Sequence, residues 1–283
     1  MTTDGVAKSA TRNTTTSTGH NDTLRQVIVV VSAVLAIIGG FVGSGAAGGQ
    51  AVQVASGGAL AADATPIAPG GPAFSIWSVI YLGLVAYAIW QALPGQRTVE
   101  RHRRLGYWVA ASLLLNAAWI LSVQFDLLPL SVPVIALLLV VLVRAFFITL
   151  ATRPENLVDT VVTDGTVGLY LGWVCVATAA NIAAVLADAG FRGFGLGLDT
   201  WGVVIIAIAG AVGVALALRG RGRIAPTLSL SWGLSWVAVA RLSGDLESTP
   251  TAVAAIVAVI AVVVATIVLR LRERRSPELS ARR

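Results

Sequence analysis

The chain has 283 residues, of which 56% are apolar and 12% are charged, and its mean hydropathy is +0.82. This composition is typical of a polytopic membrane protein and excludes a soluble globular domain. The net charge of +6 does not indicate nucleic-acid binding, because the basic residues lie in short segments between apolar runs and act there as topology signals.

The N-terminal segment, residues 1–24, is rich in Thr, Ser, Asn and Gly, so we predict a disordered tail. An apolar run then extends from Val27 to about Val42. It has features of a signal peptide, because small residues near 59–64 would suit cleavage. The glycines at 39, 43, 45 and 49, however, have the spacing of close helix packing, so we favour a retained first helix.

Residues 46–72 form a long loop rich in Gly, Ala and Pro, and a loop of this length is usually disordered or functional. Further apolar segments bring the expected total to eight membrane spans. They cover residues 74–93, 105–125, 130–150, 165–187, 201–218, 225–239 and 253–269. The sequence therefore predicts an all-α fold, a polytopic transmembrane helix bundle.

Arginine and lysine residues gather in alternate connections of this scheme. They occur in the N-terminal tail, in the second, fourth and sixth loops, and in a basic tail at 272–283. By the positive-inside rule, both termini are expected in the cytoplasm.

The span at 165–187 carries no formal charge but contains Tyr170, Trp173, Thr178 and Asn181. Helical geometry places Tyr170 and Asn181 within about 20° of each other around the axis, and Trp173 lies close to the same face. A buried amide is costly unless another group takes its hydrogen bonds. This face should therefore meet protein, ligand or water instead of lipid.

Aromatic and amide side chains of three spans lie at one expected depth. Counting about 1.5 Å per residue from the outer ends places them in the outer half of the membrane, beneath the long loop. They are Trp77, Tyr81, Asn116, Trp119, Trp173 and Asn181. Two interpretations stay open: an aromatic pocket for a flat, mostly apolar ligand, or amides that bond helix to helix.

Three segments resemble the tryptophan-rich sensory protein family, also called TspO/MBR or translocator protein. They are PAFSIWSVIYLGLVAYAIWQ at 72–91, LLLNAAW at 113–119 and LYLGWVCVATAANIA at 169–183. The resemblance implies a five-helix core at 25–187, often a homodimer, with a pocket beneath the first loop. It also implies that the pocket binds porphyrins such as haem or protoporphyrin, or other flat hydrophobic ligands. Carried over by motif, the pocket residues are Phe74, Trp77, Tyr81, Asn116, Trp119, Trp173 and Asn181.

The chain departs from the family pattern in two ways. Its first loop lacks a Trp- and Lys-Pro-containing segment and offers Pro66, Pro69 and Pro72 instead, and three additional helices occupy residues 188–271. Within these, SLSWGLSWVAVAR has serines and tryptophans one turn apart, which indicates close helix contact. Arg241 is expected to pair with Asp245 or Glu247.

No catalytic motif is visible. One cysteine and two histidines give no basis for a disulfide or a metal cluster, and the predicted spans contain no acidic pair. We predict a binding protein or sensor that requires no cofactor and whose partners are membrane lipid and a small hydrophobic ligand, in a bacterial or archaeal cell membrane. The alternative is a facilitative transporter or exporter of a small amphipathic molecule; an enzyme of porphyrin breakdown is a weaker third class.

Overall fold

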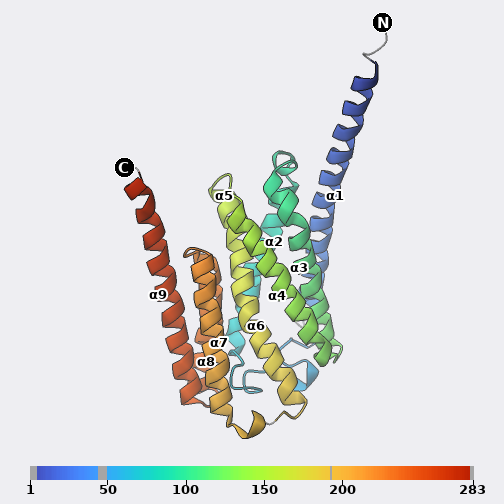
Figure 1. Ribbon diagram of the computed structural model, residues 1–283. Helices are drawn as coiled ribbons and strands as arrows, with labels where there is room; N and C mark the ends of the chain where they lie inside the picture. The colour runs from blue at the N-terminus through green and yellow to red at the C-terminus, as the bar shows by residue number, and fades with distance from the viewer. Residues whose placement is uncertain (1–4, 44–49, 192, 281–283) are drawn as a thin grey trace.

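The computed structural model describes residues 5–43, 50–191 and 193–280, with side chains described from residue 21 to 273 within these ranges. Long helices run side by side in a bundle, and the described residues include no strand (Figure 1). The long helices are α1 Gly5–Gly43, α2 Ile76–Ala92, α3 Glu100–Gln124, α4 Leu128–Ala151, α6 Thr166–Asp188, α7 Leu198–Arg219, α8 Ile224–Ser243 and α9 Thr249–Ser280. The predicted all-α polytopic bundle is confirmed.

Each predicted span corresponds to one of these helices, although the spans predicted at 74–93, 105–125 and 165–187 extend one or two residues beyond a helix end. Among the described residues, seven helices are long and apolar enough to cross a membrane. The remaining one, α8, has 20 residues and lies between α6 and α9. Its polar side chains meet these neighbours: Thr227 shares a 2.6 Å hydrogen bond with Thr266 of α9. Because protein covers much of α8, a less apolar sequence is tolerated there.

The helices pack in a regular succession. α1 packs on α3, α3 on α4, α4 on α6, α6 on α8, α8 on α9, and α9 on α7, while α2 lies against α1 and α6. The start of α1 and the end of α9 lie at one end of the bundle, and the loop between α1 and α2 lies at the other (Figure 1). We call these the terminal end and the loop end.

Small residues bring the helices close together, as the glycine spacing predicted. A Cβ at Gly39 of α1 would lie 3.1 Å from the Cβ of Ala117 of α3, and one at Gly43 would overlap Ile120. Gly172 of α6 likewise lies against Pro226 and Ser229 of α8. Gly45 and Gly49, which share this spacing, lie outside the described residues.

The N-terminal segment differs from its prediction. Residues 1–24 were expected to be disordered, whereas α1 already begins at Gly5. The apolar span already provides the costly nucleus of the helix, and no proline precedes Pro66 to stop its extension upstream. The helix therefore extends upstream of the membrane span.

The described part of the first loop, residues 50–72, packs over the loop end of the bundle. It contains short turns at Ser56–Gly58 and Gly71–Ser75, and it buries Leu60, Ile67 and Ala68. The Ser56 hydroxyl donates to the Val123 carbonyl at 2.7 Å, which ties the loop to the end of α3.

Candidate functional site

Trp77 is the centre of an aromatic cluster at the loop end. Its ring lies 5.6 Å from Tyr81, 6.4 Å from Trp119, 5.9 Å from Tyr170 and 6.1 Å from Trp173, measured between centroids. The Trp77 and Trp119 planes differ by 28°, whereas Tyr170 and Trp173 meet Trp77 edge-on at 70° and 85°. Helices α2, α3 and α6 thus bring their aromatic residues to one level, as the counting of depths predicted.

The two amides of the cluster bond to side chains of other helices. Asn116 is fully buried, and its Nδ2 donates to the Tyr81 hydroxyl at 2.7 Å. Asn181 accepts from Trp119 Nε1 at 3.1 Å and donates to the Ser131 hydroxyl of α4 at 2.8 Å. The interpretation of the amides as links between helices therefore describes Asn181 well. The Asn116 side-chain oxygen has no hydrogen-bond partner in the described part of the chain.

A pocket of about 530 Å³ opens beside the cluster, between α1, α2, α3 and residues 51–53 of the loop. Phe74, Trp77, Tyr81 and Trp119 form one of its walls. Its other lining residues are Ile37, Gly40, Phe41, Gly43, Ala51, Val52, Gln53, Ser78 and Ile120. The surface is mostly apolar, with a few polar groups near the aromatic wall.

The tip of Tyr81 reaches the opposite side of this pocket. A Cβ on Gly40 of α1 would lie 2.9 Å from both Cζ and the hydroxyl oxygen of Tyr81, so glycine leaves room for the phenol. Because Tyr81 accepts its hydrogen bond from Asn116, its own proton remains available to a ligand. Tyr81 therefore presents an unused hydrogen-bond donor at the pocket wall.

A second, much smaller cavity lies directly beneath the loop. Its volume is about 30 Å³, and it lies between the loop residues Leu60 and Thr65 on one side and the aromatic residues on the other, which are Phe74, Trp77, Trp119 and Trp173. A space of this size holds water but no organic ligand. The loop thus nearly fills the position directly above the cluster, and the larger opening lies to its side.

The loop is held in place by α8. Arg241 is 1% exposed and donates to the carbonyls of Thr65, at 3.2 Å, and Ala62. The Gly70 amide donates to the Trp236 carbonyl at 3.2 Å, and Trp232 Nε1 donates to the Ala73 carbonyl at 2.9 Å. The expected pairing of Arg241 with Asp245 or Glu247 is wrong, because the loop supplies buried carbonyl acceptors that an exposed carboxylate cannot match.

The structure places the predicted site residues in two groups. Phe74, Trp77, Tyr81 and Trp119 line the pocket, while Trp173, Asn116 and Asn181 support these side chains from behind. Sequence reasoning missed the contributions of Ser131 and of α1. Tyr170 was assigned to the correct face of its helix but not to the cluster. The glycine spacing of the first span was the pattern that could have indicated that α1 lies against the pocket.

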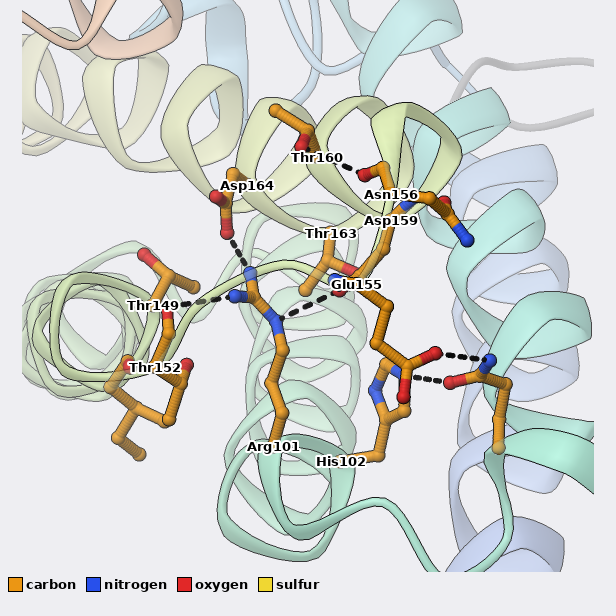
Figure 2. Close-up of polar contacts among 12 residues, drawn as sticks. Arg101, His102, Thr149, Thr152, Glu155, Asn156, Asp159, Thr160, Thr163 and Asp164 are labelled. Carbon is orange, nitrogen blue, oxygen red and sulfur yellow. Dashed lines mark hydrogen bonds and ion pairs between the residues drawn. The ribbon is translucent and has the colours of Figure 1, made fainter.

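A buried polar cluster lies at the terminal end, far from the pocket along the helices. Arg101 of α3 is 3% exposed and contacts Asp159 at 3.4 Å and Asp164, as Figure 2 shows. Arg223, which precedes α8, joins Asp164 at 3.2 Å and donates to the Thr149 carbonyl of α4 at 2.9 Å. Burial lowers the pKa of the Arg223 guanidinium, and the Asp164 carboxylate opposes this effect.

This cluster corrects two interpretations of the sequence. The spans were expected to contain no acidic pair, but a short helix, α5 Leu157–Asp159, and a π-helical turn at Thr160–Gly165 continue α6 upstream and bury Asp159. Arg101 was interpreted as a topology signal in a loop, whereas it connects helices inside the bundle. Because each carboxylate has an arginine partner, the cluster serves to hold α3, α4, α6 and α8 together.

Comparison with known proteins gives one match. The model of the family described as TSPO-like protein matches residues 26–269, which includes the three additional helices. No curated protein and no solved structure matches the chain.

Proposed function

Because the chain belongs to the TSPO-like protein family, we propose that this membrane protein binds a flat, mostly apolar ligand in the pocket between α1, α2 and α3. The observation that carries the proposal is the pocket itself. Its volume of about 530 Å³ falls within the range of about 300 to 1,000 Å³ that is usual for small-molecule sites.

The walls of the pocket favour a planar ligand. Trp77 and Trp119 lie nearly parallel and offer aromatic surfaces for stacking, and the Tyr81 hydroxyl offers one hydrogen bond to a polar edge. A porphyrin-like tetrapyrrole such as protoporphyrin has both features. None of the lining residues is His, Cys or Met, so the pocket suits the ring system of a porphyrin better than the iron of haem.

Binding is favoured over facilitated transport. A conduit needs a continuous opening through the bundle, but the cavity beneath the loop measures only about 30 Å³, and α8 holds the loop by several hydrogen bonds.

The arginine distribution supports cytoplasmic termini in a cell membrane, and the family resemblance suggests a homodimer.

The test is a titration of the purified protein with protoporphyrin, followed by quenching of tryptophan fluorescence. We expect saturable quenching that weakens in Trp119→Phe, whereas Trp201→Phe, which alters a tryptophan outside the pocket, retains the affinity. Equal quenching in both variants, or quenching that never saturates, would refute the proposal. Flux of the ligand into proteoliposomes without saturable binding would support transport instead.

A further inference from the structure

A second polar pocket lies at the terminal end, between the first turns of two membrane spans. It has a volume of about 320 Å³ and is lined by Asn21, Asp22, Arg25, Arg103 and Tyr107. The spans that form it are Asn21–Gly43 and Glu100–Gln124, so the pocket lies where the apolar part of each helix begins. It is separate from the aromatic pocket, with which it shares no lining residue.

Positive charge exceeds negative charge in this pocket. Arg103 donates to both carboxylate oxygens of Asp22, at 2.8 and 2.5 Å, and Arg25 approaches the same carboxylate at 3.4 Å. Asp22 is the only carboxylate among the lining residues, and it faces two guanidinium groups. One positive charge is therefore left without a counterion in the pocket.

Arg25 has a hydrogen-bonding group that the described residues do not satisfy. The side chain is 1% exposed because its stem lies on Gly106, where a Cβ would come within 2.9 Å of Cδ. Its Nη2 donates to the Arg97 carbonyl at 3.0 Å, but its Nε has no partner. Because this donor is itself covered by protein, Arg25 contributes positive potential to the pocket, whereas Arg103 and Tyr107 supply the accessible polar groups.

An exposed tyrosine lines this pocket, and an exposed leucine directly precedes Arg25 in the chain. Tyr107 is 47% exposed and Leu24 is 48% exposed, so a molecule with its anionic group in the pocket would have hydrocarbon surface beside it. Basic pockets between transmembrane helices are suited to lipid headgroups, and guanidinium groups match phosphate geometry. We propose that this pocket binds the phosphate of an anionic phospholipid.

Lipid binding and a purely structural role predict opposite effects of neutralising Asp22. Its carboxylate competes with a phosphate for Arg103, so neutralising Asp22 should strengthen lipid binding even though it removes an ion pair. A purely structural role of the three side chains predicts the opposite, a loss of order and of any bound lipid.

The experiment uses the full chain in a neutral detergent, with bound lipid counted by native mass spectrometry. The probes are phosphatidylglycerol, phosphatidylcholine and inorganic phosphate. We expect phosphatidylglycerol to bind in preference to phosphatidylcholine, Arg103→Gln to weaken its binding about fivefold, and Asp22→Asn to strengthen it.

The matched control is Arg104→Gln, which removes the same charge from the neighbouring position. Arg104 is exposed and paired with Glu100 at 2.8 Å, outside the pocket. Equal losses in Arg103→Gln and Arg104→Gln would indicate general attraction of the basic surface and overturn the proposal. So would equal binding of the two lipids, weaker binding in Asp22→Asn, or Arg103-dependent binding of inorganic phosphate as tight as that of the lipid.

Discussion

The indole nitrogen of Trp119 donates to the side-chain oxygen of Asn181 at 3.1 Å, so one residue of the pocket wall is fixed by an amide of α6. Asn181 in turn contacts Ser131, and the three side chains join α3, α4 and α6. The orientation of the aromatic wall therefore depends on a polar contact behind it.

Replacing this amide should lower stability. Asn181→Ala leaves Trp119 Nε1 without its acceptor, and an unsatisfied buried donor costs about 1 to 3 kcal/mol. We expect a lower free energy of unfolding, measured by thermal unfolding in detergent. Thr178→Val is the matched control, because the Thr178 hydroxyl donates only to the Val174 carbonyl of its own helix. Equal effects of the two variants would contradict this account.

The Tyr81 hydroxyl should contribute to affinity. Tyr81→Phe keeps the aromatic surface but removes the donor available to a ligand and leaves Asn116 Nδ2 unpaired. A lost hydrogen bond of about 1.4 kcal/mol corresponds to an approximately tenfold weaker Kd for protoporphyrin. Tyr107→Phe, outside the pocket, should leave Kd unchanged. An unchanged Kd in Tyr81→Phe would mean that the ligand is held by stacking alone.

The glycine opposite Tyr81 should control the shape of the pocket. In Gly40→Ala the new methyl group would come within 2.9 Å of the phenol and push its tip aside, while the rest of the bundle keeps its packing. We expect weaker protoporphyrin binding with little change in the unfolding temperature. Gly71→Ala, where a Cβ would meet no atom within 4 Å, serves as the control. A large drop in unfolding temperature would instead show that Gly40 is needed for packing.

Arg241 should govern the mobility of the first loop. Arg241→Gln removes the donors to the Ala62 and Thr65 carbonyls, so the amides of residues 60–70 should exchange their hydrogens faster. The measurement is hydrogen exchange followed by mass spectrometry, together with the dissociation rate of bound protoporphyrin, which should rise. Arg221→Gln alters an arginine whose side chain is 76% exposed, and it should change neither quantity. Unchanged exchange in Arg241→Gln would show that the other contacts suffice.

The charged cluster at the terminal end should stabilise the folded protein. Asp164→Asn leaves Arg101 and Arg223 without their shared carboxylate, and breaking a buried ion pair from one side costs about 3 to 5 kcal/mol. We expect a strongly reduced unfolding temperature. Glu273→Gln, which breaks the exposed pair with Arg221, should cost little. Similar unfolding temperatures for the two variants would show that the cluster contributes no more than surface charges.

The sequence was sufficient to predict the helices and the level of the aromatic cluster, because both follow from helical geometry and the length of a membrane span. It could not predict the contacts of Arg241, whose acceptors are backbone carbonyls about 180 residues earlier and carry no side-chain signal. Asp164 was assigned to the end of a span because the π-helical turn that continues the helix has no pattern of its own. In both cases a charged residue near the end of a predicted span is covered by another part of the chain.

The hydrogen bonds from α8 to the first loop connect the first five long helices to a part of the chain that follows residue 187. A fragment ending near residue 187 would expose the carbonyls of Ala62 and Thr65 and deprive the Gly70 amide of its acceptor. A shortened version that keeps the loop in this position therefore needs α8, or another molecule that covers the same backbone groups.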